Sequence, residues 1–167
     1  DQATGISSSG TGNLPLPGQE IAPTDSSFMV GKMAIHIFTK KLENNLLALS
    51  ATAGGRAALL DTISAIALQT PEFPDFNKDG FPDILLNYRA NNTTNFLYIF
   101  DTASKKFKNI DGYINFPDAI QLKENPKYYF SYYSDGCSDL NWASDLFFIE
   151  NFKPVKVAHM YGKGCDF

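Results

Sequence analysis

The stretch Asp75-Phe76-Asn77-Lys78-Asp79-Gly80-Phe81-Pro82-Asp83 has oxygen-bearing side chains at its first, third, fifth and ninth positions, and glycine at its sixth. Glycine allows the sharp turn that other residues resist, so the chain can curl and bring these oxygens together. A Ca²⁺ ion takes roughly six to eight oxygen ligands at short range. The spacing therefore predicts a calcium loop. Its predicted ligands are the side chains of Asp75, Asn77, Asp79 and Asp83 and the backbone carbonyl of Phe81.

This loop is shorter than an EF-hand loop. The EF-hand pattern requires a glutamate at its twelfth position, where this sequence has Leu86. The shorter D-x-N-x-D-G-x-x-D pattern fits between two strands. The alternative is a turn rich in Asn, Asp and Gly that binds no metal, because these residues favour turns on their own.

Short runs of β-branched and aromatic residues, separated by turn residues, occur on both sides of the loop. Such runs are typical of strands. The predicted strands span residues 33–38, 46–53, 56–63, 83–88, 95–100, 107–110, 120–122, 128–133, 146–149 and 155–160. We therefore predict an all-β fold, a single antiparallel β-sandwich or partial-propeller-like domain with the calcium loop between strands.

Residues 40–69 allow two interpretations. The segment is rich in Ala and Leu, which favours a helix, but it contains Gly54-Gly55 at its centre. Two adjacent glycines would cost a helix about 1 kcal/mol each relative to alanine. The same pair suits the two-residue turn of a β-hairpin, so we favour a hairpin.

The composition limits the possible functions. The chain has 167 residues, enough for one domain, and its net charge of −4 argues against binding to nucleic acid. No apolar run approaches the roughly 20 residues of a membrane span. Residues 1–26 are rich in Ser, Gly, Thr and Pro and contain no Lys or Arg, so we predict a flexible leader before a domain at 27–167. Because the sequence begins at Asp1 rather than Met, we expect a removed signal peptide or a trimmed N-terminus.

The two cysteines, Cys137 and Cys165, are compatible with one disulfide in the C-terminal part of the chain. The alternative is two buried free thiols. Disulfides persist outside the cytoplasm, and calcium sites of this type also suit that setting. We therefore expect an extracytoplasmic location, in the periplasm, at the cell surface or in the medium.

Residues that could support catalysis are few. Nucleophilic catalysis would require a serine or cysteine beside a histidine and an acid. The only histidines, His36 and His159, lie in strand-like runs next to apolar residues, where a histidine more often faces solvent or a neighbouring residue. Three acids, Asp135, Asp139 and Asp145, cluster near Trp142 and leave open an enzyme or a carbohydrate-binding domain. Acids in a loop are more often solvated or capping groups. We therefore expect a protein that is not an enzyme.

Aromatic residues provide the candidate binding surface. Residues 128–133 are almost all aromatic, and Trp142 follows closely. In a strand, alternate side chains face opposite sides, so about half of these rings should be buried. Tyrosine and tryptophan are enriched in binding hot spots. We consider Tyr129, Tyr133 and Trp142 as the candidate surface.

From about Ala34 to its end, the chain resembles a family of small secreted or periplasmic β-domains with one D-x-N-x-D-G-x-x-D loop. The family is related to periplasmic lysozyme inhibitors and to immunity proteins that neutralise secreted peptidoglycan hydrolases. The resemblance rests on the 75–83 loop, the Ile84-Leu85-Leu86 strand and the aromatic segment Asn95-Phe96-Leu97-Tyr98-Ile99-Phe100. The loop alone is also similar to those of FG-GAP and VCBS repeats, but it occurs once, so a full propeller is not expected.

The resemblance implies a Ca²⁺-stabilised module that binds a protein partner. A peptidoglycan hydrolase is the partner that it suggests, which would make the chain an inhibitor or immunity protein. The alternative is an accessory subunit of a larger cell-envelope or surface assembly, docked through the 1–26 leader.

Overall fold

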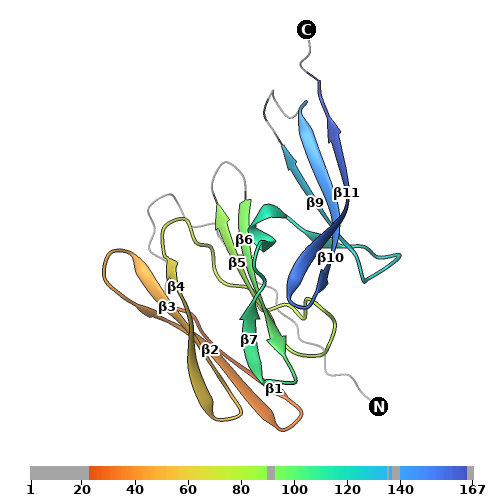
Figure 1. The fold of residues 1–167 in the computed structure, drawn as a ribbon. Coiled ribbons are helices and arrows are strands. Elements are labelled where there is room, and N and C mark those ends of the chain that lie inside the picture. The colour runs from red at the N-terminus through yellow and green to blue at the C-terminus, as the bar shows by residue number, and fades with distance from the viewer. Residues whose placement is uncertain (1–22, 90–92, 135, 137–139, 165–167) are drawn as a thin grey trace, which may run out of the picture.

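The computed structural model describes residues 23–89, 93–134, 136 and 140–164, and these residues form three antiparallel sheets (Figure 1). The sheets follow one another along the chain, and neighbouring strands in each sheet are neighbours in sequence. This arrangement confirms the predicted all-β antiparallel fold.

The N-terminal sheet contains β1 (Asp25–Val30), β2 (Met33–Lys41), β3 (Leu46–Ala53) and β4 (Arg56–Ser64), in that order. The turn between β3 and β4 consists of Gly54 and Gly55, whose φ angles are 57° and 80°. Two consecutive residues with positive φ form the turn that matches the twist of a hairpin, and glycine adopts this conformation without steric cost. The predicted hairpin is therefore confirmed, and the helical alternative is wrong.

The predicted leader extended too far into the chain. Asp25 and Ser26 belong to β1, where they pair with Phe38 and Ile37 of β2. The sequence Asp25-Ser26-Ser27 is polar because β1 is the outer strand of the sheet, where one face of these residues meets solvent. Its composition therefore resembles that of a linker although the backbone is paired.

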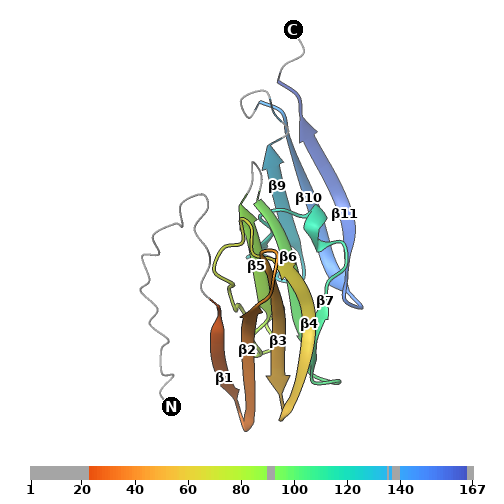
Figure 2. The ribbon, with the colours of Figure 1, turned by 90° about the vertical axis from the view of Figure 1, so that its left-hand side faces the viewer.

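The central sheet contains β5 (Ile84–Arg89), β6 (Thr93–Asp101) and β7 (Lys106–Asn109). The C-terminal sheet has the order β11-β10-β9-β8, made of β8 (Ile120–Gln121), β9 (Tyr129–Ser134), β10 (Trp142–Glu150) and β11 (Lys153–Gly162). A short 3-10 helix, η1 (Tyr113–Asn115), lies between these two sheets in sequence. Figure 2 shows an elongated molecule in which the C-terminal sheet extends beyond the other two.

Two apolar clusters fill the spaces between the three sheets. The first includes Ile37 of β2 and Phe100 of β6, and the second includes Leu97 of β6 and Phe147 of β10. Successive residues of β6 point to opposite faces, so this strand contributes to both clusters. The central sheet is therefore a middle layer, covered on one face by the N-terminal sheet and on the other by the C-terminal sheet.

Candidate metal centre

The 75–83 loop lies in the connection from the N-terminal sheet to the central sheet. The segment before it runs along the outer edge of β5, through isolated bridges from Leu68 to Tyr88 and from Glu72 to Leu85. The loop then leads directly into β5 at Ile84. Its position between strands agrees with the prediction from the sequence.

The first carboxylate of the loop closes a tight curl. Asp75 accepts hydrogen bonds from the backbone N–H groups of Asp79 at 3.0 Å and Gly80 at 3.1 Å. Gly80 has a φ of 87°, and Lys78 adopts a φ of 62° within the same turn. Glycine takes the first of these angles readily, which is why the pattern places it there.

The next two polar side chains, Asn77 and Asp79, form hydrogen bonds within the same curl. The Asn77 side-chain oxygen accepts from the Asp79 N–H at 3.3 Å, and the Asp79 carboxylate accepts from the Phe81 N–H at 2.9 Å. The Asn77 amide also donates to the Asp79 carboxylate at 2.9 Å. The oxygens at the first, third and fifth positions are thus gathered on one short stretch of backbone.

Asp83, at the ninth position, is fully buried. Its two oxygens accept hydrogen bonds from the backbone N–H of Phe76 at 2.9 Å and of Phe100 at 2.8 Å. Burial raises the pKa of the Asp83 carboxyl to about 6 despite these two hydrogen bonds, and the nearby charge of Asp79 adds to the increase. The ninth residue therefore connects the loop to β6.

Two aromatic side chains of the loop enter different cores. Phe81 packs against the first cluster and stacks on Phe100, with ring centroids 5.1 Å apart. Phe76 packs against the second cluster and stacks on Tyr129 of β9 at 4.6 Å, while the Tyr129 hydroxyl donates to the Phe76 carbonyl at 3.0 Å. The loop therefore contacts both interfaces between the sheets.

The donor set of the loop suits a hard cation. It consists of three carboxylates and one amide within nine residues, and oxygen is the ligand atom that Ca²⁺ prefers. In the part of the chain that the structure describes, no three His, Cys, Asp or Glu side chains are grouped as metal ligands. The loop oxygens instead accept hydrogen bonds from backbone N–H groups. The residues fit Ca²⁺ by their chemistry, and holding it would require the exposed side chains of Asn77 and Asp79 to reorient.

The three aromatic residues of the candidate binding surface lie in different environments. Tyr129 is only 4% exposed and belongs to the second core cluster, so it is not a surface residue. Tyr133 pairs with Ala143, the neighbour of Trp142 on β10, so Tyr133 and Trp142 point to opposite faces of the sheet. Trp142 stacks on Tyr132, which is 47% exposed and which the sequence did not single out.

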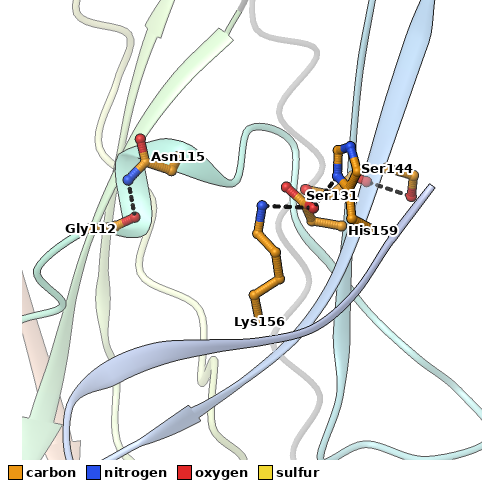
Figure 3. A network of polar contacts seen from close by, with 7 residues as sticks. Gly112, Asn115, Ser131, Ser144, Lys156 and His159 are labelled. Atoms are coloured by element: carbon orange, nitrogen blue, oxygen red, sulfur yellow. Dashed lines mark hydrogen bonds and ion pairs between the residues drawn. The ribbon is translucent and has the colours of Figure 1, made fainter. Parts of the chain in front are cut away.

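A buried carboxylate in the C-terminal sheet has two basic partners (Figure 3). Asp145 is 2% exposed and bonds to His159 Nδ1 at 2.7 Å and Lys156 Nζ at 2.9 Å. Ser131 lies opposite Asp145 on β9, and its hydroxyl is buried without a partner among the residues described. Asp145 thus separates Ser131 from His159, whereas a nucleophilic serine requires a histidine beside its hydroxyl.

The remaining predicted residues divide into two groups. His36 bonds to Asp25 of β1 at 2.6 Å, an exposed contact between neighbouring strands. The other residues, Asp135, Asp139, Cys137 and Cys165, lie outside the described residues. The proposed disulfide and the acidic cluster around Asp139 therefore stay predictions. The described part of the chain contains no helix with the length and apolar character needed to cross a membrane.

Comparison with known proteins shows a shared fold. No protein-family model and no curated protein sequence matches the chain. A solved structure of a Type IV secretion system related protein from Xanthomonas superposes with a TM-score of 0.54 at 14% sequence identity. The match covers 92% of this chain and 88% of that chain. At this identity, the match shows that the two chains have the same kind of fold.

Proposed function

We propose that this chain is a Ca²⁺-stabilised protein-binding module that acts outside the cytoplasm and is not an enzyme. The observation that supports this proposal best is the position of the 75–83 loop. Phe81 packs into the first core and Phe76 into the second, while Asp83 accepts from a backbone N–H of β6. A ligand that rigidifies this loop therefore stabilises the contacts among all three sheets.

The proposed ligands are the side chains of Asp75, Asn77, Asp79 and Asp83 and the carbonyl of Phe81. A bound Ca²⁺ would supply positive charge that offsets the mutual repulsion of the three carboxylates. The chain already brings these groups together through Gly80 and the backbone hydrogen bonds of Asp75. Such an arrangement reduces the conformational entropy that ligand binding must overcome.

A peptidoglycan hydrolase is the partner that we propose. The resemblance of the loop and its neighbouring strands to periplasmic lysozyme inhibitors and immunity proteins supports this choice. The arrangement of Ser131, Asp145 and His159 supports a role other than nucleophilic catalysis, because the carboxylate lies between the serine and the histidine.

The second candidate is an accessory subunit of a larger cell-envelope assembly. The fold similarity to a Type IV secretion system related protein favours this second candidate. In this case residues 1–26, or the part of them before β1, would dock the domain to the assembly.

An inhibition assay separates the two candidates. Purified chain is added to a panel of lysozyme-type hydrolases acting on cell-wall suspensions, in Ca²⁺ and in chelator, and clearing of turbidity is measured. We expect stoichiometric inhibition of one hydrolase in Ca²⁺, reduced in chelator and in the variant Asp79→Ala. The matched control is Glu124→Ala, an exposed acid outside the loop, which should inhibit like the parent chain. Absence of inhibition across the panel contradicts the inhibitor function and favours the second candidate.

A further inference from the structure

A cavity lies between the N-terminal sheet and the central sheet, beside the first residues of β4. Its volume is about 700 Å³. The lining comes from the end of β3, the first half of β4 and the turn that leads into β7. Its walls are formed in part by small or apolar side chains, including Ala51, Ala53, Leu60 and Phe107.

This cavity runs along a backbone edge. β4 is the outer strand of its sheet, and β7 is the outer strand of the central sheet. Four consecutive residues of β4, from Arg56 to Leu59, all line the cavity, although their side chains alternate between two faces before the bulge at Leu60. A cavity bordered by both faces of one strand lies beside the strand, where main-chain groups are available.

The register identifies these main-chain groups. Ala53 and Arg56 flank the two-residue turn, and residues in that position exchange both of their hydrogen bonds. Hydrogen-bonded and non-hydrogen-bonded pairs alternate along an antiparallel ladder. The N–H and C=O groups of Ala57 and Leu59 therefore point away from β3 and toward the cavity, whereas those of Ala58 bond to β3.

Most other outer strands are protected against pairing with a further strand. β7 and β8 are short, with four and two residues, and β5 is bridged by Leu68 and Glu72. β11 carries two lysines and a proline near its start, residues that block strand addition. The stretch Ala57-Ala58-Leu59 has no charge and no proline. It is an unprotected edge.

The mouth of the cavity is positively charged although the chain as a whole carries −4. Arg56, Lys105 and Lys106 all line it. None of the three forms an ion pair with another residue that the structure describes. An acidic partner would therefore find unpaired cations here.

We propose that the β4 edge binds an extended acidic segment of a protein partner, which adds to the N-terminal sheet as a fifth strand. The segment bonds to the outward main-chain groups of Ala57 and Leu59. Its small apolar side chains enter the cavity, and its carboxylates pair with Arg56, Lys105 and Lys106. Strand addition of this kind obtains affinity from the main chain and specificity from alternate side-chain pockets. This inference rests on the protein-binding function proposed above, for which it supplies a surface and a partner chemistry.

The test uses a fluorescein-labelled peptide of alternating glutamate and valine, with the nine-residue length of β4. Binding to the full chain is followed by fluorescence anisotropy, and backbone amide exchange is followed by NMR. We expect saturable binding, and slowing of amide exchange by about tenfold or more at Ala57 and Leu59. The Ala58 amide is the internal control, since it is already paired with β3. A peptide of alternating lysine and valine should not bind.

Two variants at one position separate the backbone from the side chain. Leu59→Pro removes an outward N–H without removing a bond to β3, and it should weaken peptide binding about tenfold. Leu59→Ser keeps that N–H, so its dissociation constant for the peptide should stay within about threefold of the value for the parent chain. Charge reversal at Lys105, in Lys105→Glu, should weaken binding at low salt more than at high salt. Circular dichroism verifies that each variant is folded, and the exchange experiment on the parent chain needs no variant.

Several results would overturn the proposal. These are no saturable binding of the acidic peptide, equal binding of the basic peptide, or unchanged exchange at Ala57 and Leu59. Saturable binding of dodecanoate without peptide binding would identify the cavity as a site for an anionic lipid instead. Inhibition of a hydrolase by the Leu59→Pro variant at parental strength would also exclude this surface, but would leave the proposed protein-binding function intact.

Discussion

The buried carboxylate of Asp83 accepts a hydrogen bond from the backbone N–H of Phe100, 17 residues further along the chain, at 2.8 Å. Phe100 belongs to β6, in the middle layer of the fold, and Asp83 also accepts from Phe76 in its own loop. One buried side chain therefore satisfies two backbone donors, a part-buried one in its own loop and a buried one in β6. This relationship makes Asp83 a structural residue before any metal is considered.

Replacing Asp83 by alanine should destabilise the chain in both Ca²⁺ and chelator. The change leaves the N–H groups of Phe76 and Phe100 without an acceptor, and each unsatisfied buried donor costs about 1–3 kcal/mol. We expect the free energy of unfolding, measured by urea denaturation, to fall by about 2–4 kcal/mol in chelator. Asp83→Asn keeps one acceptor oxygen, so its free energy of unfolding should fall by less. A loss below about 0.5 kcal/mol in chelator would contradict this role.

Asp79→Ala should act on the calcium dependence alone. Asp79 is exposed, and its carboxylate accepts only from the loop itself, so the variant should unfold almost like the parent chain in chelator. In the parent chain, free Ca²⁺ at 100 times its dissociation constant adds about 2.7 kcal/mol of stability. We expect most of this increment to disappear in the variant. If the parent chain has the same melting temperature with and without chelator, the loop is a turn that binds no Ca²⁺.

Tyr98→Phe should weaken the contact between the N-terminal and central sheets. The Tyr98 hydroxyl, in β6, donates to the Asp61 carboxylate of β4 at 2.6 Å. Burial raises the pKa of this phenol, and Asp61 raises it further, so the hydroxyl stays a donor at neutral pH. Removing it should cost about 1–3 kcal/mol, because bonds to charged groups are the stronger ones.

The comparison for this variant is Tyr88→Phe. The Tyr88 hydroxyl donates to the Ser64 carbonyl at 3.0 Å, a neutral acceptor on the same strand as Asp61. Losing this hydrogen bond should lower the free energy of unfolding by less, about 0.5–1.5 kcal/mol, as measured by urea denaturation. Equal losses at the two positions would mean that the charge of Asp61 does not strengthen the Tyr98 bond.

Asp101 should make folding stability sensitive to strong acid. Lys108 bonds to its carboxylate at 2.6 Å and, together with a smaller contribution from Ser104, lowers the Asp101 pKa to about 2. A lowered carboxyl pKa stabilises the fold above the pKa of the unfolded chain, near 3.9, and the benefit is lost as the pH falls toward about 2. Asp101→Asn should flatten the decrease in stability over this interval, measured by thermal unfolding at each pH. A parallel decrease in variant and parent would contradict this assignment.

Gly162→Ala should displace the only tryptophan. An alanine Cβ at position 162 would lie 2.3 Å from the Trp142 ring nitrogen, far inside contact distance. The ring must then move, and it should lose its stacking on Tyr132. We expect a shift in the tryptophan emission maximum with β-sheet circular dichroism unchanged. Val157→Ala is the control, since Val157 is an exposed residue on the same strand as Gly162. Unchanged emission in Gly162→Ala would contradict the close approach.

Local features of the fold could be predicted from short stretches of the sequence. Gly54-Gly55 indicated a hairpin because only a turn with two positive φ angles uses both glycines, and both angles are positive in the structure. Short runs of β-branched and aromatic residues predicted the strands, and the spacing of Asp75, Gly80 and Asp83 predicted a curled loop before a strand. These features depend on steric and hydrogen-bonding preferences over a few residues, which the local sequence contains.

The packing of the three sheets determines which strand faces are covered and which distant residues come into contact. Tyr129 and Tyr132 belong to the same aromatic run, yet Tyr132 is exposed whereas Tyr129 is buried, with Phe76 of the loop stacked on it. Asp145 appeared to belong to a loop cluster, but strand register places it beside His159, which is 14 residues away. The exposed edge of β4 follows from sheet order rather than from its residues. Each of these outcomes depends on packing between segments far apart in the chain, for which short sequence patterns contain no signal.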